Sequence, residues 1–235
     1  VITGLTGASL FANVYNAQIS GLTIRECSNL RDAASSQQLG ILASRSLKSK
    51  FSDLFFDKVE LRGKARIGFV SGDDGWMGVS GVTAQGSRFE RIQVTNGKMT
   101  CGTAAVSAQS GWGGFITGWM LNGSMEDIYV QGSLATYGAR CGGVLGAIAG
   151  SAQLNRCISK VDLGIGVNSV ASKVGVLLGD IDVDHRGEYD AESTRISNCI
   201  GLGKPTPRQS DFEFPANTGW RLAGYTVKEA ASAFQ

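Results

Sequence analysis

Histidine, proline and paired cysteine motifs are scarce in this chain of 235 residues. The single histidine, His185, and the absence of any Cys-x-x-Cys pair argue against the usual zinc sites, which combine several such ligands. All three prolines follow residue 204, so the preceding residues lack the side chain that removes a hydrogen bond from a β-sheet. This absence favours a continuous sheet over residues 1–204.

Charge of one sign and long apolar runs are also missing. The 22 lysine and arginine residues nearly balance 20 aspartate and glutamate residues, and no basic run alternates with aromatics, as nucleic-acid binding would favour. The longest apolar stretch, 142–150, is far shorter than the about 18 to 20 residues that a membrane span needs. We therefore expect neither nucleic-acid binding nor membrane insertion.

The chain begins at Val1 without the charged and apolar segments of a signal peptide. This beginning indicates either a processed protein or a segment of a larger polypeptide. Hydrophobic residues make up 43% and charged residues 18%, which is typical of one ordered domain with a substantial core.

What the chain does contain is a six-residue phrase that occurs six times. It consists of an apolar residue, two polar or small residues, an apolar residue, any residue, and then usually an apolar or small one. The copies occupy 19–24, 51–56, 89–94, 125–130, 154–159 and 196–201. Their unequal spacing indicates a unit with a fixed core and loops of variable length, as stacked repeat proteins have.

Each phrase follows a short apolar run that in most copies carries glycine. The runs occupy 10–12, 39–43, 67–70, 114–118, 143–146 and 174–179. They are too short for helices and suit buried strands, and the connections lack helical periodicity. One unit is therefore predicted to be strand, loop, strand, loop. Glycine, at 33 residues, is about twice its usual share of roughly 7%, which fits the many turns.

These units predict an all-β fold, a single-stranded parallel β-helix of about six coils, which we expect to be right-handed because that form is the commonest. Equivalent strands of successive coils would pair about 4.8 Å apart. The expected β-helix covers 1–203, with coils near 9–38, 39–66, 67–113, 114–142, 143–173 and 174–203. Residues 204–235 are expected to form a C-terminal cap or linker, irregular over 204–225 and ending in a short helix.

Two cysteines, Cys157 and Cys199, hold the same position in consecutive phrases. Stacked coils would place them on adjacent rungs, at a separation compatible with a disulfide. The same position holds Leu54, Ile92 and Ile128 in other copies, which favours the simpler interpretation of small inward apolar side chains.

The last repeats resemble a known family. The glycine runs 143–146 and 175–179, each followed by a phrase with cysteine at its fourth position, are similar to the GLUG repeats of bacterial surface proteins. The similarity extends loosely over 9–203. GLUG arrays occur in secreted or wall-attached adhesin-like proteins and in the non-catalytic region of immunoglobulin A peptidases. The resemblance implies an extracellular or cell-surface module whose partners are other copies or domains of a larger surface protein; the His-Glu-x-x-His peptidase motif is absent.

Three carboxylates form the best candidate for a chemical site. In an extended strand, Asp180, Asp182 and Asp184 lie on one face, where they would bind a cation such as calcium, act in glycosidase-type catalysis, or form a plain outward polar face. An EF-hand-like loop would need Gly and Glu where this chain has His185 and Ala191. The polar face is the favoured interpretation, and calcium is the one cofactor to consider.

Two tryptophans, Trp76 and Trp112, lie in glycine-rich sequence outside the strand phrases. Their flat apolar faces are suited to contact a sugar ring, although covering a flank of the coil is the favoured role. Because the insertions at 72–113 and 180–195 are not explained by the repeat, function is expected there.

The sequence as a whole predicts a non-catalytic structural or adhesive extracellular module, either a rigid spacer or a filament-forming subunit. The alternative is a polysaccharide-binding or polysaccharide-cleaving β-helix of the tailspike or lyase type. Residues 1–5 are apolar enough to be a pairing strand for another copy or an incomplete first coil.

Overall fold

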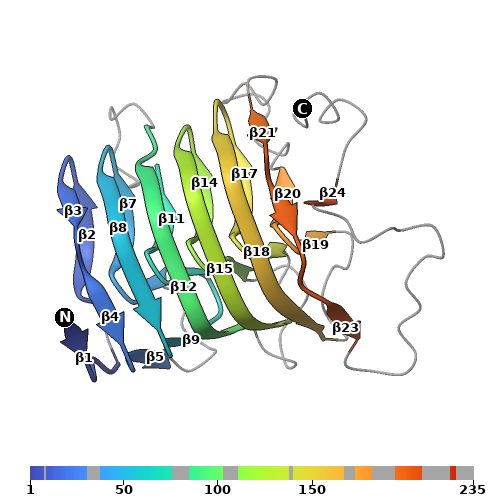
Figure 1. Ribbon diagram of the computed structural model, residues 1–235, viewed down its shortest axis with the longest axis horizontal. Helices are drawn as coiled ribbons and strands as arrows, with labels where there is room; N and C mark the ends of the chain where they lie inside the picture. The colour runs from blue at the N-terminus through green and yellow to red at the C-terminus, as the bar shows by residue number, and fades with distance from the viewer. Residues whose placement is uncertain are drawn as a thin grey trace.

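The computed structural model describes residues 1–7, 9–30, 38–75, 85–102, 111–137, 140–166, 173–181, 194–207 and 223–225. Strands form three sheets, named A, B and C, in which all strand pairs are parallel. Figure 1 shows equivalent strands side by side along the long axis, from blue at the N-terminus to orange near the C-terminus. The chain is therefore a parallel β-helix, as predicted. No helix in the described ranges has the length and apolar character to cross a membrane.

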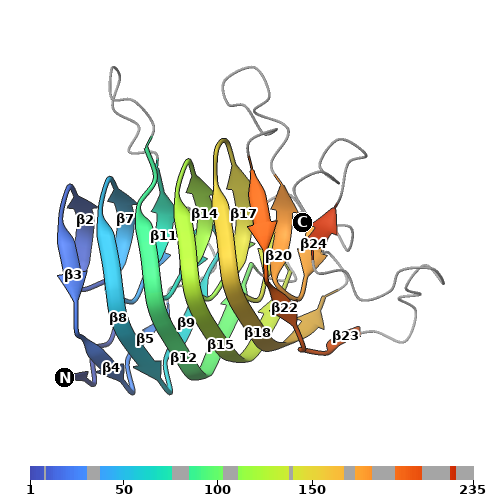
Figure 2. The same ribbon diagram turned by 45° about the horizontal axis from the view of Figure 1, so that its top comes forward.

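Sheet A carries the recurring phrase and runs the length of the molecule (Figures 1 and 2). Each of its main strands pairs with the equivalent strand of the next coil, in the order β1-β4-β8-β12-β15-β18-β21. Its strands are β1 (Ile2–Thr3), β3 (Gln18–Ser20), β4 (Thr23–Arg25), β5 (Ser28–Leu30), β8 (Lys50–Asp57), β9 (Glu60–Gly63), β12 (Arg88–Cys101), β15 (Ser124–Thr136), β18 (Gln153–Ile165), β21 (Arg195–Ser197), β22 (Ile200–Gly201) and β23 (Pro205–Pro207).

Sheets C and B follow sheet A in each coil, in that order. Sheet C contains β6 (Leu39–Gly40), β10 (Arg66–Gly68), β13 (Trp112–Gly113), β16 (Arg140–Gly142) and β19 (Val174–Gly175). Sheet B contains β2 (Phe11–Tyr15), β7 (Ala43–Leu47), β11 (Ser71–Asp74), β14 (Thr117–Leu121), β17 (Leu145–Ala149), β20 (Leu178–Ile181) and β24 (Ala223–Tyr225). A coil thus has three faces, although the sequence predicted two strands for each.

Glycine explains the third face. In the structure, the glycine run that was predicted as one strand is divided between a strand of sheet C and a strand of sheet B, with a turn after its first glycine. A second glycine, four residues later, allows sheet B to pack against sheet C. A Cβ atom added at Gly146 would lie 2.8 Å from the Gly113 nitrogen and closer still to the Gly118 carbonyl oxygen. Backbone atoms occupy the space that any side chain would need. The glycine pairs are 68 and 72, 114 and 118, 142 and 146, and 175 and 179.

The third residue of each phrase has a left-handed backbone conformation. The values of φ are 68° at Gly21, 56° at Asp53, 50° at Arg91, 56° at Asp127, 52° at Arg156 and 54° at Asn198. Such a residue interrupts the alternation of side chains across the strand. The apolar residues before and after it therefore both face inward, as the buried Phe51, Leu54 and Phe56 show. This bulge is the physical reason why the phrase does not alternate strictly.

The core is a stack of equivalent side chains from successive coils. Phe51 and Phe89 are parallel with ring centroids 5.2 Å apart, and Phe69 and Phe115 have centroids 4.8 Å apart. One carboxyl group interrupts this apolar stack: Asp74 is fully buried and accepts hydrogen bonds from the Ser46 hydroxyl at 2.7 Å and the Ser87 backbone nitrogen at 2.8 Å. Burial raises the pKa of Asp74 to about 7.

At the two ends of the described coil, the structure selects one of the two alternatives for residues 1–5 and adds two short strands to the expected C-terminal cap. At the N-terminal end, β1 pairs with β4 through Ile2 and Ile24, so residues 1–5 belong to an incomplete first coil. At the other end, residues 205–207 pair with β18 and residues 223–225 with β20, where an irregular segment was predicted. The expected helix ending at residue 235 lies outside the described residues.

Two prolines are compatible with β23 because this strand is paired on one side only among the described residues. The carbonyl of Lys204 accepts a hydrogen bond from the Leu163 nitrogen at 2.9 Å. The backbone N–H and C=O groups of Lys204 and Thr206 therefore point toward β18. Since backbone N–H and C=O groups alternate in direction along a strand, those of residues 205 and 207 point away from β18. The missing N–H groups therefore remove no hydrogen bond to β18.

Candidate functional site

Trp112 and Asp180, which the sequence assigned to two separate sites, lie in one cluster of side chains. The cluster occupies the corner where sheets B and C pack back to back. Trp112 pairs in register with Arg66 on the coil before it and with Arg140 on the coil after it. In sheet B, Trp119 lies between Asp73 and Ala147, and Ala147 pairs with Asp180. We name this the corner cluster; its members are Arg66, Asp73, Trp112, Trp119, Arg140, Lys173 and Asp180.

Ion pairs join the two columns of the corner cluster. Arg66 Nη1 lies 2.7 Å from Asp73 Oδ2, and Arg140 Nε lies 2.7 Å from Asp180 Oδ2. Lys173 Nζ is 3.4 Å from the same Asp180 oxygen. Both carboxylates are buried: burial raises the pKa of Asp73, and the neighbouring guanidinium of Arg66 opposes that increase. The cations thus offset the cost of burying the two negative charges.

The tryptophans of the corner cluster pack against arginine side chains. The rings of Trp112 and Trp119 meet edge to face, with centroids 6.2 Å apart. The guanidinium carbon of Arg66 is 4.7 Å from the centroid of the Trp112 ring, and that of Arg140 is 4.2 Å from it. A sugar stacking on Trp112 would have to displace these cations, which come from the coils on both sides. The contacts of Trp112 match a covering role on the flank of the coil.

The predicted cation site is only partly described. Asp180 lies in β20, where the carboxylate is already paired with Arg140 and Lys173. Asp182 and Asp184 lie outside the described residues, as does Trp76. Within the described ranges, no three His, Cys, Asp or Glu side chains are placed to hold a metal ion together.

The cationic half of the corner cluster was missed at the sequence level, although a signal for it exists. Arg66, Trp112, Arg140 and Lys173 each stand two residues before the first glycine of a pair. Aligning the units on that glycine places them in one column. Because residues of one column lie next to one another in stacked coils, this column places arginines on both sides of Trp112.

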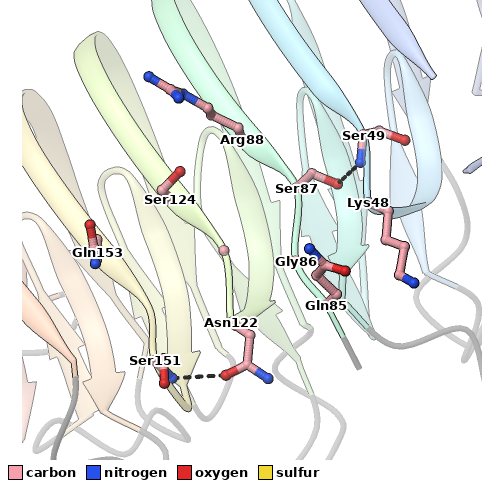
Figure 3. Close-up of a pocket in the computed structure, with 11 residues that line it drawn as sticks. Lys48, Ser49, Gln85, Gly86, Ser87, Arg88, Asn122, Ser124, Ser151 and Gln153 are labelled. Carbon is pink, nitrogen blue, oxygen red and sulfur yellow. Dashed lines mark hydrogen bonds between the residues drawn. The ribbon is translucent and has the colours of Figure 1, made fainter. Parts of the chain in front are cut away.

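A polar groove lies on the described surface (Figure 3). It has a volume of about 420 Å³ and crosses four successive coils at the turns that lead into sheet A. Hydrogen bonds between coils hold its floor: Asn122 Oδ1 accepts from the Ser151 nitrogen at 2.8 Å, and the Ser49 nitrogen donates to Ser87 Oγ at 3.2 Å. The lining residues are Lys48, Ser49, Gln85, Gly86, Ser87, Arg88, Asn122, Gly123, Ser124, Ser151 and Gln153.

The chemistry of this groove is that of hydrogen bonding with some positive charge. Gln85 and Gln153 are exposed and present amide groups, while Lys48 and Arg88 supply cations. Arg88 is ion-paired with Glu90 and, at 3.4 Å, with Glu126, whereas no ion pair joins Lys48 to an acidic side chain among the described residues. A hydroxyl-rich chain that carries some negative charge fits this lining.

Searches against protein-family models, curated proteins and solved structures give no match to this chain.

Proposed function

We propose that the protein is a rigid, non-catalytic module of an extracellular or cell-surface assembly, with a structural or adhesive role. The observation that carries the proposal is the unbroken stacking of β8, β12, β15 and β18. Each of these strands keeps its register with the next along the whole phrase. A shape fixed by ladders of backbone hydrogen bonds is stiff along its axis, which is what a spacer requires.

Surface charges add a second set of links between coils. Arg91 and Asp53 form a two-point ion pair with distances of 2.6 and 2.8 Å, and Arg156 and Asp127 form an equivalent pair at 2.6 and 2.9 Å. These side chains start from the bulged third position of the phrase. The bulge therefore supports stiffness as well as the inward direction of its apolar neighbours.

The similarity to GLUG repeats supports the surface location and the choice of partners, namely other copies or other domains of a larger surface protein. The first coil adds an argument for stacking in a filament. Its strand β2 exposes Phe11 by 40% and Tyr15 by 57%. Apolar side chains along an unpaired strand edge favour addition of a further parallel strand.

A glycan screen combined with imaging tests this proposal. Incubation with a panel of polysaccharides, followed by detection of new reducing ends, is expected to give no more product than a heat-denatured sample. Negative-stain images are expected to show straight rods, single or joined end to end. Cleavage that disappears in the Asp182→Asn variant would replace the structural proposal with an enzymatic one.

The groove of Figure 3 favours a second candidate function, the binding of a linear polysaccharide along the axis of the coil. Polar groups recur there from coil to coil, so successive sugar units would meet similar partners. The cation Lys48, which no ion pair neutralises among the described residues, favours an acidic chain such as a polyuronate over a neutral glucan.

Substitution of one exposed amide tests the groove. Gln153→Ala is expected to weaken binding of a polyuronate about threefold to tenfold, since one hydrogen bond contributes about 0.5–1.5 kcal/mol. Gln93→Ala is the matched control, because Gln93 is also an exposed glutamine on sheet A but does not line the groove. Binding measured by calorimetry that changes equally in both variants, or favours the neutral glucan, would remove this candidate.

A further inference from the structure

Two pairs of cysteines meet across coils, and they differ in exposure. Cys101 and Cys141 contact each other through their thiols, and both are fully buried. Cys157 and Cys199 also contact each other; Cys157 is fully buried, but Cys199 is partly exposed. No disulfide joins any of the four. The two pairs share one chemistry and differ in access from solvent.

The register of the last coil places Cys157 and Cys199 directly opposite each other. Asn155 pairs with Ser197, and Ile158 pairs with Ile200, so the residues between them are neighbours on adjacent rungs. Directly opposed residues on paired strands have Cα atoms within the range of about 4.4–6.8 Å that a disulfide bridges. Both cysteines follow the bulged residue of their phrase, at Arg156 and Asn198, and therefore leave the strand in the same direction.

Their thiols are unequal in a way that suits stepwise oxidation. The hydrogen bond from Cys157 lowers the pKa of Cys199, while the same contact and burial raise the pKa of Cys157. Reactivity with a disulfide requires a thiolate that solvent can reach. Cys199 is the more accessible of the two thiols and has the lower pKa, and Cys157 lies behind it as the resolving thiol.

We propose that Cys157 and Cys199 form a disulfide that fastens the last coil to the preceding one when a small disulfide such as oxidised glutathione is present. The Cys199 thiolate attacks one sulfur of glutathione disulfide and releases one glutathione thiolate, leaving a mixed disulfide. The sulfur of Cys157 then attacks Cys199 Sγ and releases the second glutathione. The proton of Cys157 passes to the departing thiolate, so two protein thiols and one glutathione disulfide yield one protein disulfide and two glutathiones.

The bond would act at one end of the described coil. The strands β21, β22 and β23 pair with β18 on one side, and no strand covers their other side in the described ranges. A cross-link from Cys157 to Cys199 prevents these strands from separating from β18 during local opening. This inference concerns the cohesion of the coil and does not depend on what the module binds.

Peptide mapping of the native protein after treatment with glutathione disulfide tests the proposal. We expect a mass loss of about 2 Da and a cross-linked peptide that joins Cys157 to Cys199. Hydrogen exchange at the amides of Arg195 and Leu202, which donate to the carbonyls of Ala152 and Ser159 in the preceding coil, is expected to slow about tenfold or more, and dithiothreitol should restore the original rate. Cys101 and Cys141 provide the internal control and should stay reduced.

The Cys199→Ser variant provides the second control. Its hydrogen exchange should be unaffected by glutathione disulfide, because the exposed thiol is gone. Three results would each overturn the proposal: a stable glutathione adduct at Cys199, oxidation of the buried Cys101 and Cys141 pair first, or no loss of free thiols in the native protein.

Discussion

Replacing Gly146 with valine is expected to abolish folding or to lower the free energy of unfolding by about 4 kcal/mol or more. The added Cβ would meet the carbonyl of Gly118 and the nitrogens and carbonyls of sheet C, where no side chain can move aside. The two sheets would have to separate along the whole corner to make room. Urea unfolding followed by circular dichroism measures the loss, and soluble expression gives a first indication.

Gly21→Asn is the matched control for this substitution. Gly21 has φ of 68°, no atom within 4 Å of an added Cβ, and an equivalent residue, Asn198, at the same position of the last phrase. Asparagine adopts this conformation readily, so a change within about 0.5 kcal/mol is expected. If Gly146→Val unfolded at the same urea concentration as Gly21→Asn, the close contact between sheets B and C would be wrong.

Arg140→Ala is expected to lower the free energy of unfolding by about 3 kcal/mol, the second largest effect. The guanidinium is the closer of the two described cations at Asp180 Oδ2, and only 8% of the Arg140 side chain and 2% of the Asp180 side chain are exposed. Truncation leaves a buried carboxylate with less neutralising charge and removes the stacking on Trp112. Thermal and urea unfolding both report this loss.

Two variants separate the effect of burial from that of pairing. Arg156→Ala breaks an ion pair of similar geometry with Asp127, but half of the Arg156 side chain is exposed, so a much smaller loss of stability is expected. The double variant Arg140→Ala with Asp180→Ala should recover part of the stability, since the unneutralised charge is also removed. Equal losses for Arg140→Ala and Arg156→Ala would contradict the buried ion pair.

The coil and its stacking could be predicted because the information for them is local. An apolar residue at a fixed place in each phrase needs a buried position. Because the phrases are alike, each buries that residue through the same backbone conformation. The sequence therefore indicated parallel pairing of residues 51–56 with residues 89–94, and the structure has that register.

The third face and the bulge could not be predicted in the same way. A glycine in an apolar run is compatible with a straight strand, and the need for it at Gly146 arises from backbone atoms of another coil. Likewise, Asp53 and Arg91 adopt positive φ although neither residue is a strong signal for it. The conformation is supported by burial of the apolar residues on both sides, which is a property of the whole coil.

The candidate site shows the same division. Sequence reasoning chose Trp112 and Asp180 by residue type but placed them in different sites, because loops of unequal length hide which positions share a column. The structure brings both against Arg140. Both side chains therefore contact Arg140, and the polar groove between Lys48 and Gln153 is a separate concave surface.

The sequence by itself determined that this protein is a stack of parallel coils, since side-chain alternation and the burial of apolar residues act within each short phrase. Only the tertiary structure decided which residues of different coils meet outside the phrases: the tryptophan, arginine and aspartate side chains of the corner cluster, the backbone contact at Gly146, and the thiols of Cys101 and Cys141. The physical reason is that contacts between coils depend on how each loop closes, and loop closure leaves no periodic pattern in the chain.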